Sequence, residues 1–416
     1  MSDSEQPDVA LKRSISLPMI VFYGVGTMLG AGIYVLISKV AGTAGMYAPL
    51  AFLVSGFIVS FSALSYSELS SRLPMSAGEA AYVQAAFSRK ILSAIVGFAV
   101  VLTGIVSAAT ISRGFVGYLN EFIQVWDVLA ITSLVLFIGV IAAWGVNEAV
   151  GAAVAITVLE IIGVLMIIVI GGSDLLTIPA RLPELIPPFD PGVWTMILFA
   201  GFLAFYAFIG FEDMVNMAEE IKRPEKTLPI AIVLALVITT ALYILVSLVA
   251  VLAMPMDELI KSEAPFTDIV RHHGVIPPWV MNAISLVAVL NGALVQVVMA
   301  SRVLYGMGRQ GLAPVRMATV HPRTQTPLLA TATVTLVVLI LAIGFPLESL
   351  ARSTSFIILC VFAMVNLSLI VIKTRQTDNV SPGVRYPIII PILGALLSCA
   401  FLLVECFRHA GAGGGH

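Results

Sequence analysis

The sequence has few charged residues, and a water-soluble surface needs many. Only 11% of its 416 residues are charged and 59% are hydrophobic, whereas a typical soluble domain is about 25% charged. This deficit excludes an ordinary soluble globular protein. The formal net charge of −2 gives no basic excess for binding nucleic acid, so we expect no nucleic-acid partner.

Cysteine and metal-ligand patterns are also scarce. The three cysteines, Cys360, Cys399 and Cys406, lie in or beside apolar runs, so we interpret them as small apolar side chains and not as a disulfide framework. His272 and His273 are adjacent in a predicted loop, and no Cys or His shows the spacing of a metal site. We therefore expect no metal and no cofactor. No signal-peptide cleavage site follows a short apolar core, so the first apolar run is expected to be a retained helix.

Long apolar runs dominate the chain. A bilayer core of roughly 30 Å requires about 20 mainly apolar helical residues, and these runs lack the alternation of barrel strands. We predict eleven membrane-spanning helices and an all-α polytopic membrane protein. The predicted spans are 17–37, 48–69, 91–112, 128–146, 149–171, 193–218, 228–254, 277–300, 327–345, 353–372 and 386–405.

Basic residues are unevenly shared between the two sides of the predicted bundle. If the N-terminus lies in the cytoplasm, the cytoplasmic side receives about twice as many Lys and Arg residues as the other side. We therefore expect a multi-pass protein of the cell membrane with a cytoplasmic N-terminus. The expected regions are a cytoplasmic tail at 1–16, a first five-helix repeat at 17–172, a second at 192–372, and an extra C-terminal helix and tail at 386–416.

The first predicted span is rich in glycine. Residues 24–32 read GVGTMLGAG, and each of these four glycines lowers helix stability by about 1 kcal/mol relative to alanine. One explanation is a break in the helix, where free N–H groups would attract a carboxylate. The other is close helix packing, which the spacing of Gly26 and Gly30 fits.

The sixth predicted span contains two acids and a glycine. Gly210, Glu212 and Asp213 follow one another closely within apolar surroundings. A charge near the bilayer centre costs a few kcal/mol, and such residues usually face a cavity or a pathway. The alternative is that both carboxylates meet water at the end of the helix. Because the first and sixth spans are five apart, matching interruptions suggest inverted halves around a central transport site.

Glu160 lies in the middle of the fifth predicted span. Because an acid at this depth needs a partner or a proton, we expect it to take part in ion coupling. The alternative is a structural hydrogen bond to another helix.

Four sequence motifs occur in order along the chain. Residues 26–34, GTMLGAGIY, resemble the pattern G-x-x-x-G-A-G-I-F. The others lie at 65–74 with 78–83, at 207–212 with 218–224 and 228–231, and at 300–311 before Pro314. In these residues the chain resembles the amino acid permease family of the amino acid–polyamine–organocation superfamily. The resemblance covers most of the chain and implies the leucine-transporter-type fold, a 5+5 inverted repeat with broken helices 1 and 6.

The resemblance also implies roles for individual residues. The backbone N–H groups expected to hold a substrate carboxylate are those of Gly30, Ala31 and Gly32. The carbonyl groups expected to receive its ammonium are those near Thr27 and at Tyr206, Ala207 and Ile209. Tyr206 also falls where related permeases often have an aromatic gate. Glu212 falls at a position implicated in proton-linked release.

The chain departs from the family pattern at three points. Many relatives have twelve spans, and we count eleven. Some proton-coupled members carry a Lys in the fifth span where this chain has Glu160. A carboxylate cannot mimic a cation, although it could bind one or carry a proton, so coupling to H+ and coupling to Na+ both stay open. Tyr34 replaces the usual Phe.

Four side chains are candidates for the pocket that sets specificity: Tyr206, Phe211, Asn291 and Gln296. The spacing of Asn291 and Gln296 suggests that they share one helix face. Hydrogen bonds within the protein are an equally good explanation for the polar pair.

These features together predict a secondary active transporter, or permease, that moves an amino acid or related amine by alternating access. No Ser/His/Asp or metal constellation converges in the spans, so we do not expect an enzyme. The alternative is a transporter-like sensor or a subunit of a larger complex without transport activity of its own. The sequence shows no soluble signalling domain, which argues against this alternative. The expected partners are the small-molecule substrate and the lipid bilayer, and the sequence carries no prediction of oligomeric state.

Overall fold

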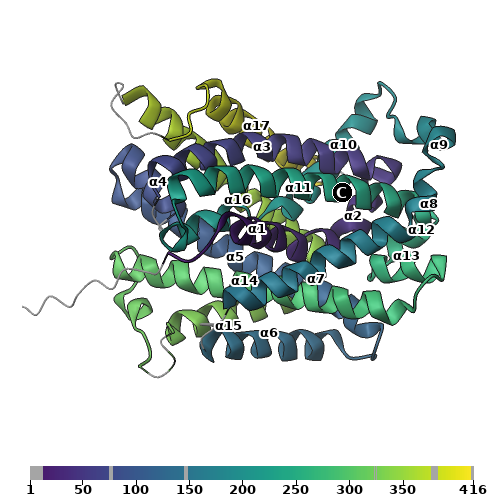
Figure 1. Ribbon diagram of the computed structural model, residues 1–416, viewed down its shortest axis with the longest axis horizontal. Coiled ribbons are helices and arrows are strands. Elements are labelled where there is room, and N and C mark those ends of the chain that lie inside the picture. The colour runs from purple at the N-terminus through teal and green to yellow at the C-terminus, as the bar shows by residue number, and fades with distance from the viewer. Residues whose placement is uncertain are drawn as a thin grey trace, which may run out of the picture.

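The computed structural model describes residues 13–74, 78–144, 149–322, 324, 326–375 and 383–413. Long helices lie roughly side by side along the longest axis of the molecule (Figure 1). Apart from one bridge between Ile15 and Ile221, no β pairing occurs within these ranges. The predicted all-α class is confirmed.

Eleven spans can be followed through these described ranges, each overlapping its predicted position, with ends that differ from the predicted ones by up to nine residues. They are α1 (Leu17–Ala31) with α2 (Ile33–Ala44), α3 (Ala48–Arg72), α5 (Lys90–Asn120), α6 (Asp127–Trp144), α7 (Ala149–Ile170), α10 (Pro191–Ala204) with the 3-10 segments η2 (Phe205–Phe208) and η3 (Glu212–Glu220), α11 (Pro224–Ala253), α14 (Pro278–Arg309), α15 (Leu328–Gly344), α16 (Leu347–Arg375) and α17 (Ile389–Gly413). By length and hydropathy eight helical stretches qualify as candidate spans, with α2 and α3 taken as one, and α1, α7 and α15 contribute three shorter apolar helices. The chain is therefore a multi-pass membrane protein.

Short helices mark the two ends of the bundle. The N-terminal end carries α4 (Gly78–Phe87) and η4 (Val315–Ala318). The opposite end carries η1 (Gly45–Tyr47), α8 (Gly172–Leu175), α9 (Ile178–Leu185), α12 (Met256–Lys261) and α13 (Pro265–His273). Residues 1–12 of the predicted N-terminal tail and residues 414–416 of the predicted C-terminal tail lie outside the described residues.

Helix starts follow local sequence signals. At the start of α10 the Asp190 carboxylate accepts hydrogen bonds from the N–H groups of Gly192 at 2.6 Å and Val193 at 3.2 Å. Such a cap satisfies N–H groups that the first turn of a helix leaves free. Proline occupies the first position of α10, α11 and α14, where its missing N–H costs nothing.

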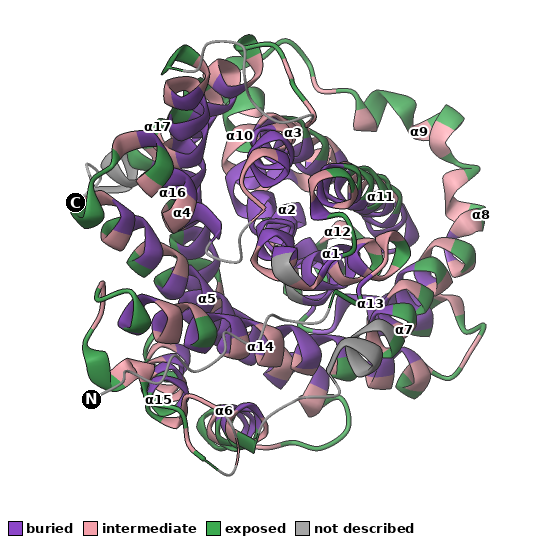
Figure 2. Cartoon of the chain, turned by 60° about the vertical axis from the view of Figure 1, so that its left-hand side comes forward, coloured by how far each residue is buried: buried purple, intermediate pink, exposed green. Residues whose placement is uncertain are grey.

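The first span lies in the interior of the bundle. α1 packs against α7, α11 and α14, and α2 packs against α10; Figure 2 shows both helices enclosed by others. α6 and α15 lie together at the edge and expose apolar side chains such as Leu136 and Leu336. An apolar outer surface of this kind suits contact with lipid.

Both spans predicted to be broken are interrupted. In the first span α1 ends at Ala31, Gly32 has φ −104° and ψ −69°, and α2 begins at the next residue. The sixth span is interrupted more widely, because Ile209 is extended and Gly210 has φ +125°, a conformation that favours glycine. The break in the first span is therefore confirmed, and it is narrower than that in the sixth.

The other glycines of α1 serve close packing. A Cβ atom at Gly24 would overlap the side chain of Met214, and one at Gly26 would overlap Thr157. Both explanations for the glycine run therefore hold, each at different residues.

The two interruptions occur at equivalent places in the order of spans. Each is in the first of five successive spans, α1 to α7 in one half and α10 to α16 in the other, and α17 follows as an extra helix. An odd offset of five makes the halves run in opposite senses across the membrane. This is the leucine-transporter-type arrangement of two inverted repeats.

Candidate functional site

The two interruptions touch each other in the middle of the bundle. Gly32 lies so close to Ala207 that a Cβ atom added to it would overlap the Ala207 backbone. A Cβ atom at Gly210 would lie 2.9 Å from the carbonyl carbon of Thr27. The backbone groups predicted to bind the two ends of a zwitterion are therefore neighbours.

Two buried hydroxyl groups hold the backbone carbonyls at this contact. Thr27 Oγ1 lies 2.9 Å from the Gly24 carbonyl oxygen and 3.0 Å from that of Gly210. The Tyr243 hydroxyl, from α11, lies 2.7 Å from the carbonyl oxygens of both Met28 and Ala207. Because one hydroxyl has one proton, each of them shares it between the first and sixth spans or donates to one acceptor at a time.

The predicted carbonyl acceptors have different hydrogen-bond donors in the structure. That of Ala207 faces the Tyr243 hydroxyl, whereas that of Tyr206 receives the Ile209 N–H at 3.2 Å. Thr27 contributes its hydroxyl to the contact. Sequence analysis missed Tyr243, although a tyrosine within an otherwise apolar span was a signal that could have identified it.

The predicted N–H donors surround the break in the first span. Gly30 and Ala31 are the last residues of α1, and Gly32 caps both α1 and α2. The first turn of α2 therefore starts at the contact with Ala207, where its N–H groups and its positive dipole end are placed. This position suits a carboxylate, and the binding role of these three residues stays a prediction.

Tyr206 is buried and turns toward α5. Its hydroxyl lies 3.0 Å from the Ser107 hydroxyl and 3.2 Å from the Ser107 carbonyl oxygen. Its ring therefore lies between the interrupted sixth span and the third span. Its predicted role as a gate stays a prediction.

Glu160 lies on a different face of α1 from Ala207. A Cβ atom at Gly30 would lie 3.3 Å from Glu160 Oε1 and 3.1 Å from the Ala288 carbonyl oxygen. A Cβ atom at Gly32 would instead overlap Ala207 of η2, so the two glycines have different neighbours. The Glu160 carboxyl is thus separated from the contact of the two breaks by the backbone of α1.

Glu160 is fully buried and its carboxyl has one neutral partner. The Asn291 amide of α14 donates to Oε1 at 3.0 Å, and Oε2 lacks a hydrogen-bond partner within the described residues. The sequence also allowed a structural hydrogen bond from Glu160 to another helix. That hydrogen bond is present. It satisfies only one of the two carboxyl oxygens.

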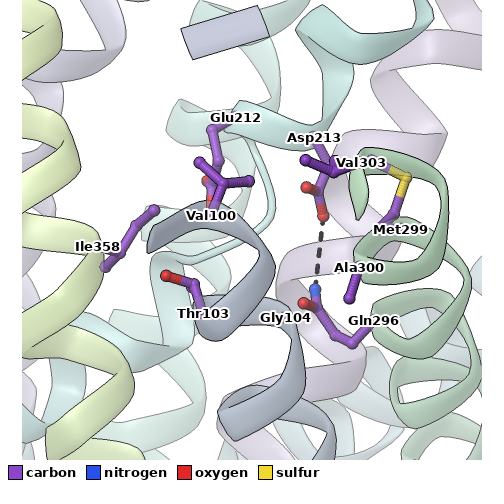
Figure 3. A pocket seen from close by; sticks show the side chains of 10 residues that line it. All are labelled: Val100, Thr103, Gly104, Glu212, Asp213, Gln296, Met299, Ala300, Val303 and Ile358. Carbon is purple, nitrogen blue, oxygen red and sulfur yellow. Dashed lines mark hydrogen bonds between the residues drawn. The ribbon is translucent and has the colours of Figure 1, made fainter. Parts of the chain in front are cut away.

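Glu212 and Asp213 are both buried, at 4% and 7% exposure. The alternative that they meet water at a helix end is therefore wrong, because neighbouring helices cover them. Glu212 Oε2 accepts the Gly210 N–H at 2.9 Å, and Asp213 Oδ2 accepts the Gln296 amide at 3.4 Å. Both line a narrow cavity of about 10 Å³ between α5, η3 and α14, shown in Figure 3 with Thr103. Such a space holds about one water molecule.

The pocket candidates do not converge in this conformation. Phe211 packs edge-on against Tyr66 with ring centroids 5.4 Å apart. Asn291 contacts Glu160, while Gln296 contacts Asp213. The expectation that Asn291 and Gln296 share a face is wrong, because five residues turn a helix by about 500°, which places them roughly 140° apart. No group of three or more His, Cys, Asp or Glu residues in the described part of the chain could hold a metal ion.

Comparisons with known proteins agree with this architecture. The amino acid permease family profile matches residues 15–413. The branched-chain amino acid permease BcaP of Bacillus subtilis is 28% identical, over 95% of this chain and 88% of its own length. The mitochondrial cationic amino acid transporter 3 of Arabidopsis thaliana is 30% identical over 87% of this chain, which spans 63% of that relative. The methylthioribose transporter of Bacillus subtilis is 25% identical, over 94% of this chain and 88% of its own length.

A solved structure shares the fold. It is a sodium-coupled sialic acid symporter in a substrate-bound outward-open state, with a TM-score of 0.60 and 12% identity, covering 91% of this chain and 88% of that one. At this identity the likeness concerns the fold alone. With two interrupted spans in contact and a family match over nearly its whole length, the chain belongs to the amino acid permease family.

Proposed function

We propose that this chain is a secondary active transporter that carries an amino acid or a related amine across the cell membrane. It works by alternating access and makes no covalent change to its substrate. The observation that carries the proposal is the contact between the two interrupted spans at Gly32 and Ala207. The excess of basic residues on its side supports a cytoplasmic N-terminus.

The substrate would bind by its two charged ends. Its carboxylate would take the N–H groups at Gly30, Ala31 and Gly32, and of these Gly32 lies where the positive end of the α2 dipole begins. Its ammonium would take carbonyl groups of the interrupted sixth span, including that of Ala207. These carbonyls are the acceptors of the internal hydroxyls, so substrate and hydroxyls compete for the same groups.

Access to this site requires the two breaks to separate. In the present conformation Gly32 packs against Ala207 without room for a side chain between them. A conformation that admits a zwitterion must therefore move η2 away from α1, and Tyr206 would move with it. Alternation between separated and closed states is the minimal cycle of such a carrier.

Two carboxylates are proposed to couple the cycle to an ion. Glu160 is buried behind α1 with one oxygen unpartnered, so it can take up a proton or a small cation. Glu212 holds the Gly210 N–H at the break of the sixth span, so loss of its charge would loosen that break. Coupling to H+ and coupling to Na+ are both compatible with this arrangement.

Uptake by purified protein in liposomes tests the proposal. The experiment uses a panel of labelled amino acids and amines, each measured under an imposed proton gradient, under a sodium gradient and under exchange conditions. We expect accumulation or exchange of at least one compound above protein-free liposomes. A sensor or a subunit without transport activity would bind a compound without moving it, and that result would contradict the proposal.

A further inference from the structure

Tyr34 lies just after the break in the first span, between the turn of α7 that contains Glu160 and the short helix α13. It is the second residue of α2 and is fully buried. Its hydroxyl donates to the backbone carbonyl oxygen of Glu160 at 2.7 Å. At this position the motif that the chain resembles has a phenylalanine, which lacks this donor.

The Tyr34 hydroxyl occupies space that is left open because residue 163 of α7 is glycine. Gly163 lies on α7 one turn beyond Glu160, and a Cβ atom there would lie 2.6 Å from the hydroxyl oxygen. A side chain at 163 would therefore push the hydroxyl away from its acceptor. The fit between Tyr34 and Gly163 fixes the orientation of α2 relative to this turn of α7.

The ring and backbone of Tyr34 connect to α13 by two routes. The ring packs on Phe266 of α13 with centroids 4.8 Å apart. The Tyr34 carbonyl accepts the Tyr118 hydroxyl at 2.6 Å, and the Tyr118 carbonyl accepts the Asn282 amide at 2.9 Å. Asn282 Oδ1 in turn accepts the Thr267 hydroxyl of α13 at 3.2 Å.

The buried face of α13 covers this end of the first span. Phe266, Thr267, Ile269 and Val270 are each at most 1% exposed. The helix contacts α2, α7, α11 and α14, so it covers the ends of several helices at once. Lifting it would break both routes to Tyr34.

We infer that Tyr34 is a positioning residue that couples the state of the Glu160 site to the closure of α13. Its hydroxyl ties the first turn of α2 to the Glu160 turn of α7, and its ring and carbonyl tie that same turn to α13. A change of occupancy at Glu160 then shifts the balance between closed and lifted α13. The inference rests on the proposed coupling role of Glu160.

A buried reporter thiol measures how often α13 lifts. Cys360, Cys399 and Cys406 are replaced by alanine, and Val270→Cys or Ile269→Cys is introduced on the buried face of α13. The purified protein in nanodiscs is treated with a maleimide, which reaches these thiols only when α13 lifts. Tyr34→Phe should raise the labelling rate about fivefold, the effect of one net hydrogen bond.

A double-mutant cycle separates coupling from mere packing. Glu160→Gln should change the labelling rate severalfold when Tyr34 is present and less than about twofold in Tyr34→Phe. Gly163→Ala should also raise the labelling rate, because its Cβ would overlap the same hydroxyl as well as the Ile284 side chain of α14. Tyr47→Phe, a hydroxyl at the same end of the bundle outside this chain of contacts, should leave the rate unchanged.

Equal fold-changes for Glu160→Gln in both backgrounds would overturn the inference, as would unchanged labelling in both Tyr34→Phe and Gly163→Ala. Thermal stability measured on each variant identifies any that fail to fold. If Tyr34→Phe fails to fold, the labelling rate of Gly163→Ala tests the inference in its place. Because labelling requires no transport, uptake by the unmodified protein is scored separately. Failed uptake counts against the proposed function, and additive labelling with intact uptake counts against the role of Tyr34.

Discussion

Gly32 and Ala207 are in direct contact, although they belong to spans that are five apart along the chain. Gly32 has no room for another carbon atom at this point. The contact joins the start of α2, which offers N–H groups, to the interrupted sixth span, which offers carbonyls. A carrier that closes around a zwitterion needs both kinds of group on facing segments, and this pair brings them together.

The two glycines of the first break should respond differently to a single methyl group. Gly32→Ala would place its Cβ in the Ala207 backbone, which cannot yield as a flexible side chain would. Gly30→Ala would approach the Ala288 carbonyl at 3.1 Å and Glu160 Oε1 at 3.3 Å, which requires only small shifts. We expect Gly32→Ala to lower initial uptake at least about tenfold, equivalent to about 1.4 kcal/mol, and Gly30→Ala to lower it less.

Valine at either position should abolish uptake, since a branched side chain blocks close approach of the backbone. Each variant is compared with native protein at equal incorporation into liposomes. Native uptake by a correctly inserted Gly32→Val variant would contradict the placement of the site.

Tyr243→Phe should weaken the closed conformation. Its hydroxyl is placed to serve the Met28 and Ala207 carbonyls, and removing the donor from buried acceptors costs about 1–3 kcal/mol. Thermal unfolding in detergent should therefore occur at a lower temperature in the variant. A transported compound should raise the unfolding temperature more in the variant than in native protein, because its ammonium replaces the missing donor. The same unfolding temperature for both proteins without substrate would refute the prediction.

Glu160→Gln should change the ion dependence of transport. Gln keeps an acceptor for the Asn291 amide but cannot carry a charge or exchange a proton. Uptake is measured against pH at fixed sodium and against sodium at fixed pH. Glu184→Gln, which alters an exposed ion pair with Arg181, is the matched control and should behave as native protein. Unchanged dependence on both ions would make Glu160 a structural residue.

Glu79 should make stability depend on pH near neutrality. It lies on α4, outside the spans, where burial raises the pKa of its carboxyl from 4.5 to about 7 despite the hydrogen bond from Tyr66. Since the pKa in the folded state is higher, its contribution to stability is fully present below pH about 4.5 and is lost as pH rises through about 7. The unfolding temperature should fall across this window and fall less in Glu79→Gln. Parallel curves for the two proteins would contradict the assignment.

The spans were predictable because the length of an apolar run is a local property of the sequence. The break in the sixth span was also predictable, since Gly210 and the acids after it are poor residues for a buried helix. The hydrogen bond from the Gly210 N–H to the Glu212 carboxylate is local as well. It is expected because the carboxylate lies only two residues beyond a free donor.

Contacts between distant spans were harder to predict. Tyr243 acts on carbonyls of the first and sixth spans, and nothing in its own neighbourhood of sequence indicates which ones. Asn291 and Gln296 were assigned to one face from spacing alone, whereas five residues carry them to different neighbours. The role of each glycine in α1 likewise depended on which helix came to lie against it.

Binding of chemically blocked substrates tests the central claim most directly. For a compound that the protein transports, affinity is measured by equilibrium binding to purified protein, together with its methyl ester and its N-acetyl derivative. If facing backbone groups of the two broken spans hold the two charged ends, each blocked derivative should bind at least about a hundredfold more weakly, a loss of about 2.7 kcal/mol. Equal affinity for the parent compound and both derivatives would contradict this account.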